Sequence, residues 1–208
     1  MTKIKLCGLT RPEDIQGANG LSPDYVGFVF APRSRRYVPP EAAAALREQL
    51  RPGIAAVGVF VDASPEMVAG LLNRGVLDMA QLHGREDAAY LTALRDLTDK
   101  PLIQAFRIQT ERDVLTAEHS QADYVLLDSG AGTGMTFDWN LLQRIRRPYF
   151  LAGGLDAGNV GGAISALHPF AVDVSSGIES GGVKDYEKMR QFVRAVRGAD
   201  GKEQNHDQ

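Results

Sequence analysis

Two side chains that can take part in proton transfer end short apolar runs in this sequence. Cys7 closes the run IKLC, just before Gly8 and Thr10, and Asp128 closes the run YVLLD. A thiol is a base or a nucleophile once it is ionised, and a carboxyl group is an acid while it keeps its proton. Each also has a structural alternative, because a lone cysteine packs as a small hydrophobe and an aspartate caps turns such as the following SGAGTG. Placed across one site, the two residues predict a base facing an acid.

Two glycine-bearing segments, LAGGL and DVSSGIE, are typical of loops that bind anions. Glycine lets a ligand approach the backbone closely, and backbone N–H groups at the start of a loop or helix bind phosphate. The candidate substrate-binding residues in these segments are Gly153, Gly154, Asp173, Ser175, Ser176 and Gly177.

Basic and imidazole side chains follow other apolar runs. The segment PRSRRYVPP holds Arg33, Arg35 and Arg36. They form either a solvated surface cluster or, over the mouth of a site, a bidentate grip on a carboxylate. His83 in QLHG is either a hydrogen-bonded structural histidine or a residue that contacts substrate. No HxH or HExxH pattern occurs, so the sequence predicts no metal site.

The elements that position these residues are short and alternate in type. Eight apolar runs predict strands, at 4–9, 25–30, 55–61, 79–83, 102–108, 124–129, 149–155 and 171–178. The runs are nearly continuous, as expected for strands buried on both faces of a parallel sheet. Between them lie segments with helical spacing, including EAAAALREQL, SPEMVAGLLNRG, REDAAYLTALRDL and DYEKMRQFVRAV.

About eight strand-plus-helix units at roughly 25-residue spacing predict an α/β fold, a single (β/α)8 TIM barrel with a closed sheet of eight parallel strands. The alternative is a doubly wound open sheet, which places its phosphate-binding glycines after the first strand. Here the glycine-rich strand ends come late, which favours the barrel. The active site of such a barrel lies at the C-terminal ends of the strands. We expect one catalytic domain over residues 1–198 and a disordered polar tail over 199–208.

The composition narrows the classes of partner. The chain has 208 residues, 44% of them hydrophobic, and a formal net charge of −3, which fits a globular protein with one sizeable core. A mildly acidic protein has no electrostatic attraction to nucleic acid or to an anionic membrane. No apolar run approaches the roughly 20 residues that span a bilayer, and the N-terminus lacks a signal-peptide core. We therefore expect a cytoplasmic protein without nucleic-acid or membrane partners.

Several segments together resemble one family, the phosphoribosylanthranilate isomerases of tryptophan biosynthesis. They are KLCGLTRPED, DYVGFVFAPRSRRYV, GVFVD, AQLHG, LLDSGAGTGMTFDW, LAGGLDAGNV and FAVDVSSGIESGGVKD, in this order over nearly the whole chain. The resemblance implies a (β/α)8 barrel that is a monomer or a homodimer. It also implies an Amadori rearrangement of N-(5′-phosphoribosyl)anthranilate, without metal or organic cofactor.

The resemblance also implies roles for individual residues. Cys7 matches the general base, Asp128 the general acid, and Arg36 the arginine that holds the anthranilate end of the substrate. The two glycine-bearing segments match the phosphate-binding loops. These roles predict a lowered pKa for the Cys7 thiol and a carboxyl group at Asp128 that stays protonated.

The chain departs from the family pattern in one segment. After Asp128, Ala131 and Met135 stand where the family commonly has a glycine and a lysine. The loss of one positive charge bears on substrate affinity more than on reaction type. The alternatives are a related sugar-phosphate isomerase barrel and a barrel kept only for binding, and the second would predict erosion of the acid–base pair.

Overall fold

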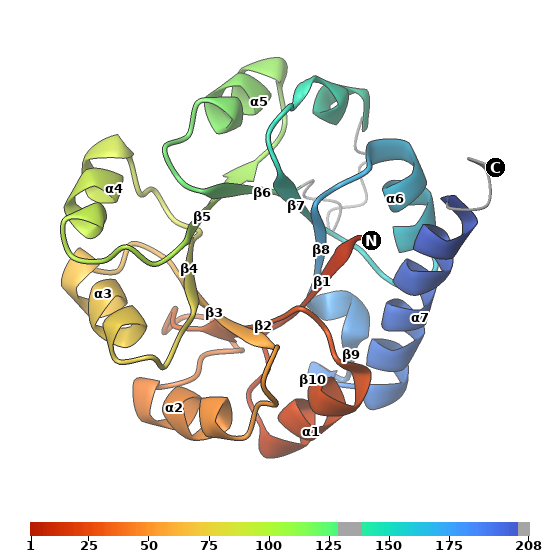
Figure 1. Ribbon diagram of the computed structural model, residues 1–208, viewed down its shortest axis with the longest axis horizontal. Coiled ribbons are helices and arrows are strands. Elements are labelled where there is room, and N and C mark those ends of the chain that lie inside the picture. Colours follow the sequence, from red (N-terminus) through yellow and green to blue (C-terminus); the bar gives the residue numbers. More distant parts are fainter. Residues whose placement is uncertain (129–138, 204–208) are drawn as a thin grey trace.

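The centre of the molecule is a closed barrel of parallel strands that follow one another in chain order (Figure 1). A computed structural model describes residues 1–128 and 139–203. Within them the barrel strands are β1 (Lys3–Cys7), β2 (Tyr25–Val29), β3 (Ala55–Phe60), β4 (Met79–Leu82), β5 (Leu102–Arg107), β6 (Tyr124–Asp128), β7 (Tyr149–Ala152) and β8 (Ala171–Val174). The predicted barrel is confirmed, and the open sheet is excluded because β1 pairs with β8.

Helices surround the barrel and cover the outer faces of its strands (Figure 1). They are α1 (Pro12–Leu21), α2 (Pro40–Glu48), α3 (Pro65–Asn73), α4 (Ala88–Arg95), α5 (Glu111–Glu118), η2 (Trp139–Arg144, a 3₁₀ helix), α6 (Val160–Leu167) and α7 (Tyr186–Glu203). After β8 come a short 3₁₀ turn, η3 (Ser176–Ile178), and a two-stranded hairpin, β9 (Glu179–Ser180) and β10 (Val183–Lys184). The predicted run 171–178 therefore divides into a strand and a turn.

Local sequence signals account for the helix starts. Proline opens α1, α2 and α3, where the missing N–H costs no hydrogen bond. The Ser64 hydroxyl accepts a bond from the Met67 N–H, and Thr110 with Asp113 forms a capping box at α5. These caps fix where each helix begins, and thereby the length of the loop that carries site residues.

Side chains inside the barrel follow the two-residue period of the strands. The lower interior is packed by an apolar cluster that includes Val57, Met79, Ile103, Leu126 and Phe150. Successive side chains point to opposite faces, so the residue two positions later lies again on the inner face. The upper interior is therefore filled by the last inward residue of each strand, where the sequence holds its reactive side chains.

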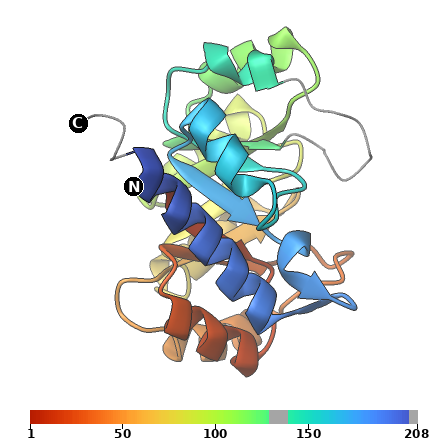
Figure 2. The same ribbon diagram turned by 90° about the vertical axis from the view of Figure 1, so that its right-hand side faces the viewer.

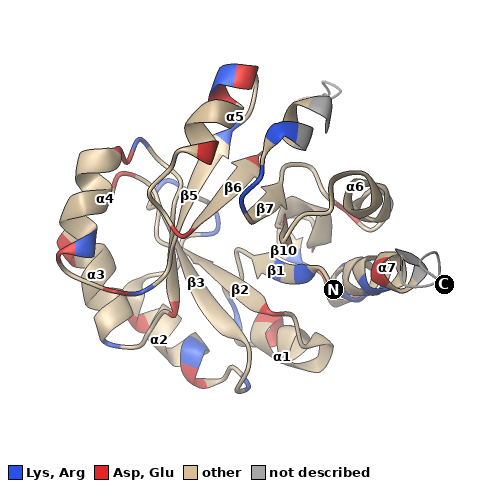
Figure 3. Ribbon diagram, turned by 45° about the horizontal axis from the view of Figure 1, so that its top comes forward, with Lys and Arg blue, Asp and Glu red and all other residues tan. Residues whose placement is uncertain are grey.

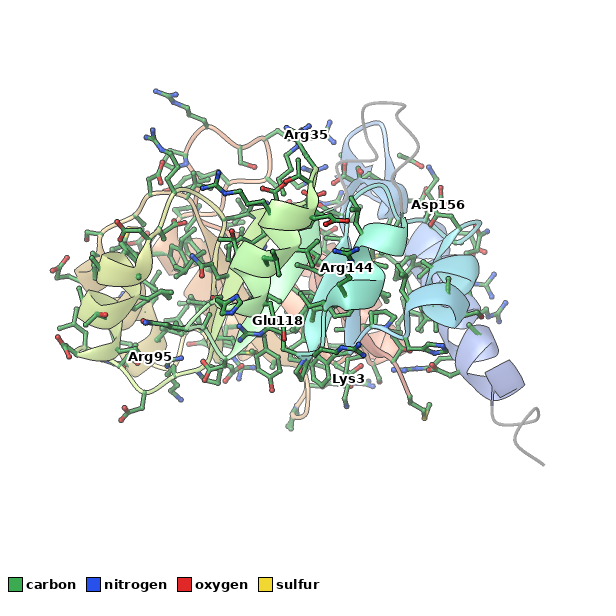
Figure 4. All side chains as sticks on the ribbon, turned by 90° about the horizontal axis from the view of Figure 1, so that it is seen from above. Lys3, Arg35, Arg95, Glu118, Arg144 and Asp156 are labelled. Carbon is green, nitrogen blue, oxygen red and sulfur yellow. The ribbon has the colours of Figure 1, made fainter. Side chains whose placement is uncertain are left out.

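Charged residues lie mainly on helices and loops, and the bodies of β2 and β3 carry none (Figure 3). Figure 4 shows the barrel from the side, with Arg35 and Asp156 at the end that bears the loops after the strands and Lys3 at the opposite end. The candidate site lies at the end marked by Arg35. Over the described ranges, no helix has the length and apolar character needed to cross a bilayer.

The C-terminal boundary differs from the prediction. Helix α7 continues to Glu203 rather than ending near residue 198, and it runs beside the N-terminus (Figure 2). The Asp200 carboxylate, buried in this contact, accepts bonds from the Thr2 backbone N–H at 3.0 and 3.1 Å and from its hydroxyl at 2.8 Å. A polar segment is ordered here because its carboxylate has partners. Residues 204–208 lie outside the described part of the chain.

Candidate active site

A cavity of about 580 Å³ opens at the C-terminal ends of the strands. Among its lining residues are Cys7 from β1, Arg36 from the loop after β2, His83 after β4, Asp128 from β6 and Gly153 after β7. The residues that the sequence singles out from separate strands thus meet in one place. A larger hollow of about 800 Å³ lies on the outer side of β5, between α4 and α5, away from most of these residues.

Cys7 is the last inward residue of β1 and is only 7% exposed, although it lines the cavity. Val29 and Val59 pack around it. Burial raises the pKa of the thiol above its ordinary value, and the positive charge of Lys5 lowers it by less. The expected lowering of this pKa is therefore wrong for the protein without ligand, because an apolar surrounding disfavours the thiolate.

Gly27 on β2 makes room for the sulfur. It is the register neighbour of Cys7, and a Cβ at this position would lie 2.6 Å from the Cys7 sulfur. No side chain fits there without displacing the thiol. Gly27, beside the thiol on the adjacent strand, is therefore required for the position that the thiol takes in the site.

We expect Gly27→Ala to lower kcat by about 100-fold, since displacement of a catalytic group by an ångström has effects of this size. Gly70→Ala is the matched control, because a Cβ added there in α3 meets nothing within 4 Å. It should keep full activity and gain about 0.4–1 kcal/mol of stability. Steady-state kinetics and thermal melting of both variants check this. Unchanged kcat in folded Gly27→Ala would show that the sulfur tolerates displacement.

Asp128 is the last residue of β6 and is partly exposed to the cavity. Its register neighbours are Arg107 on β5 and Ala152 on β7. The His83 Nε2 atom lies 4.0 Å from the nearer Asp128 oxygen. The carboxyl group thus faces the cavity from β6, which is separated from β1 by β7 and β8 around the barrel.

The tautomer of His83 follows from its neighbours. The Lys5 ammonium can only donate hydrogen bonds, and Gln81 Oε1 accepts one from it at 2.9 Å. The other end of the Gln81 amide, Nε2, lies 2.8 Å from His83 Nδ1 and must donate to it. The imidazole proton is therefore on Nε2, which faces Asp128. Burial lowers the pKa of His83 despite the opposing effect of Asp128, so the ring is neutral at neutral pH.

Lys5 was not among the residues that the sequence indicated. Its side chain is fully buried inside the barrel, and its ammonium donates to Asp173 Oδ1 at 3.0 Å as well as to Gln81. Asp173, which the sequence assigns to substrate binding, lines the cavity but is paired with this lysine. A charged residue inside an apolar strand, two positions before Cys7, was the signal available in the sequence.

Arg36 lines the cavity and is held from behind by Glu179. Its Nε and Nη2 atoms donate to the two Glu179 oxygens at 2.6 and 3.0 Å. Arg35 and Lys184 donate to the same carboxylate at 2.7 Å each. Burial raises the pKa of Glu179, but Arg36 and Lys184 outweigh it and lower the pKa to about 2. Glu179, also missed by the sequence analysis, fixes the direction of the Arg36 guanidinium.

The two glycine-bearing loops lie next to each other. Gly153 and Gly154 have φ angles of +99° and +62°, which favour glycine. A Cβ on Gly177 would lie 2.0 Å from the Leu155 carbonyl oxygen, so only glycine allows the loops after β7 and β8 to touch. The Ser175 hydroxyl donates to the Cys7 carbonyl at 3.2 Å.

These loops contribute unequally to the main cavity. Gly153, Gly154, Ser175 and Ser176 line it, whereas Gly177 lines an adjacent hollow of about 450 Å³ together with Ser176. Ala131 and Met135 lie outside the described residues. Within the described ranges, no group of three or more His, Cys, Asp or Glu side chains is arranged to hold a metal ion.

The comparisons with known proteins agree on one family. The family model for N-(5′-phosphoribosyl)anthranilate (PRA) isomerase matches residues 4–195. A protein of that name from Caldanaerobacter subterraneus subsp. tengcongensis is 42% identical over 205 residues, covering 95% of this chain and 99% of the relative.

Solved structures of the same family resemble this chain in sequence and in fold. A phosphoribosylanthranilate isomerase in complex with reduced 1-(o-carboxyphenylamino)-1-deoxyribulose 5-phosphate is 36% identical, with a TM-score of 0.84 over 95% of this chain and 100% of the other. Monomers generated from the dimeric enzyme of Thermotoga maritima are 35% identical, with a TM-score of 0.84 and the same coverage.

Proposed function

Because this chain belongs to the N-(5′-phosphoribosyl)anthranilate isomerase family, we propose that Cys7 and Asp128 are the base and the acid of its reaction. The protein is an isomerase of tryptophan biosynthesis. It converts N-(5′-phosphoribosyl)anthranilate, an aminoaldose, into 1-(2-carboxyphenylamino)-1-deoxyribulose 5-phosphate, an aminoketose. The observation that supports the two roles is that the thiol and the carboxyl group line one cavity from different strands.

The first step opens the ribose ring. Protonated Asp128 donates its proton to the ring oxygen as the bond between that oxygen and C1′ breaks. The nitrogen lone pair forms the iminium ion, and Asp128 is left as a carboxylate. Neutral His83, with Nε2–H directed at this carboxyl group, stabilises the negative charge without competing for the proton.

The second step moves a proton from carbon. The Cys7 thiolate takes the proton from C2′, and the electron pair forms the C1′–C2′ double bond of the enolamine. C1′ then gains a proton from the Cys7 thiol while the 2′-hydroxyl gives one to the Asp128 carboxylate, which yields the ketone and restores both groups. The numbers of atoms and charges balance, since substrate and product are isomers. Because the acid and the base lie on different strands, Asp128 serves the proton transfer to the ring oxygen and Cys7 serves the proton transfer from C2′.

The two ends of the substrate are anionic, and the cavity offers a donor for each. The loops of Gly153, Gly154 and Ser176 present backbone N–H groups to the phosphate. Arg36 can bind the carboxylate of the anthranilate ring with Nη1 and the second N–H of Nη2, since Glu179 uses only Nε and one N–H of Nη2. Fixing both ends places C1′ and C2′ between acid and base, which contributes several kcal/mol to catalysis.

The proposal extends to assembly and location. The similar Thermotoga maritima enzyme is described as dimeric, and we propose a monomer or a homodimer for this chain. A cytoplasmic location fits a phosphorylated substrate, which does not cross membranes unaided.

Freshly prepared N-(5′-phosphoribosyl)anthranilate tests the activity directly. We expect purified protein to cause a loss of anthranilate fluorescence and to yield a product of unchanged mass and altered retention. Protein heated past its melting transition is the control. If the protein converts a different aminoaldose phosphate but does not convert N-(5′-phosphoribosyl)anthranilate, it is a related sugar-phosphate isomerase instead.

A further inference from the structure

A fully buried lysine inside the barrel calls for an explanation other than stability. Lys5 has no exposed surface, and its partner Asp173 is only 9% exposed. Replacing a buried ion pair by apolar residues of similar volume is often neutral or stabilising. The lower interior of this barrel is filled by such apolar residues. A charged pair in the layer just below the reactive side chains therefore points to a role in the site.

One part of that role concerns the thiol. Lys5 and Cys7 are two positions apart on β1, so both side chains lie on the inner face, one layer above the other. Lys5 is also the register neighbour of Asp173 on β8, which explains their pairing. Burial raises the pKa of the Cys7 thiol, and the positive charge of Lys5 opposes this rise. Burial lowers the pKa of Lys5, but Asp173 and Cys7 outweigh it and hold this pKa above its ordinary value.

The other part concerns the acid. Lys5 donates to Gln81 and thereby fixes which end of that amide is the oxygen. The opposite end donates to His83 Nδ1, which leaves the ring proton on Nε2, 4.0 Å from Asp128. A chain of described contacts therefore connects one ammonium with both sides of the cavity.

We infer that Lys5 is a positioning residue for both members of the acid–base pair: its charge favours the thiolate of Cys7, and its bond to Gln81 sets the tautomer that His83 presents to Asp128. This inference rests on the proposed function for its consequence in catalysis. Its two structural parts can be measured without turnover.

Other charged and titratable groups also face the thiol, and the test must take their effect on its ionisation into account. They are Asp173 on β8, Lys184 on β10, Arg36 after β2, His83 after β4, Arg107 on β5 and Asp128 on β6. Asp173 disfavours the thiolate and Lys184 favours it. A variant that removes Lys5 alone therefore leaves an unpaired carboxylate beside the sulfur, which also threatens folding.

Two variants separate these effects. Lys5→Met removes only the cation, and the double variant Lys5→Met/Asp173→Asn removes both charges and leaves no unpaired buried ion. The chain has a single cysteine, so thiolate absorbance in the ultraviolet reports Cys7 alone. Each protein is titrated against the same background carrying Cys7→Ala, which subtracts the ionisation of tyrosine.

We expect the thiol to titrate at the lowest pH in the wild type, at a higher pH in the double variant and at the highest pH in folded Lys5→Met. The kcat/KM of the double variant at neutral pH should fall at least about tenfold, the factor that one unit of thiol pKa represents. Loss of activity with an unchanged thiol titration would overturn the inference, since it would show a purely structural role.

The second readout is the nitrogen NMR signal of the histidine ring. His83 should carry its proton on Nε2 in the wild type and lose this preference in the double variant. A ring protonated on Nδ1 in the wild type, or an unchanged tautomer in the double variant, would contradict the inference. Because both readouts use protein without substrate, they can fail while the isomerase activity stands, and the activity can fail while they hold.

Discussion

Cys7→Ala is expected to lower kcat by about 100- to 10,000-fold, the usual contribution of a general base, with little change in KM. In the proposed mechanism the thiol takes the C2′ proton, whereas other residues that line the cavity bind the phosphate and the carboxylate of the substrate. The variant should fold, because alanine keeps an apolar side chain among Val29 and Val59. Loss of anthranilate fluorescence measures the rate.

The pH dependence of the wild type adds a second test of the same residue. Burial raises the pKa of the thiol, so near neutral pH only a minor fraction is thiolate, and this fraction grows as the pH rises. The rate at which iodoacetamide alkylates Cys7 should therefore climb above neutral pH, and no alkylation should occur in Cys7→Ala. Val59→Ala, in the same cluster, is the control for lost packing and should keep the climb. Near-normal turnover by Cys7→Ala would refute the assignment.

Asp128→Asn is expected to lower kcat to a similar extent, again about 100- to 10,000-fold. The amide has nearly the same shape as the carboxyl group but donates no proton to the ring oxygen, so the ring stays closed. Asp99→Asn is the matched control, since Asp99 is exposed in the loop before β5, at the opposite end of the barrel. Turnover of Asp128→Asn comparable to that of Asp99→Asn would show that another group opens the ring.

The sequence predicted the barrel and the residues at its strand ends for one physical reason. The strands are apolar on both faces, so the period of two and the end of each apolar run identify the last inward side chain. Cys7, His83 and Asp128 could be found in this way. The same reasoning placed the glycine-rich loops of units seven and eight beside one cavity.

The partners of these residues could not be found along the sequence. Lys5 meets Gln81 and Asp173 across separations of 76 and 168 residues, and Arg36 meets Glu179 across 143. Such pairs follow from the register of strands that are far apart in the chain. The thiol pKa failed as a prediction for the same reason, because it reflects the balance between burial and these distant charges.

The end of the last helix shows the same limit. The segment GADGKE is polar and contains two glycines, so its composition predicts a tail. The structure orders it through Asp200, whose carboxylate bonds to Thr2, 198 residues away. Composition describes the intrinsic preference of a segment, whereas a tertiary contact decides its final structure.

The most direct test of the acid and base roles is the kinetic isotope effect of deuterium at C2′ of the substrate, measured in single turnovers. Removing the base makes the C2′ proton transfer the slow step, whereas removing the acid makes ring opening slow. We therefore predict a large primary isotope effect for the residual reaction of Cys7→Ala and almost none for Asp128→Asn. The reverse pattern, or the same effect in both variants, would contradict the account.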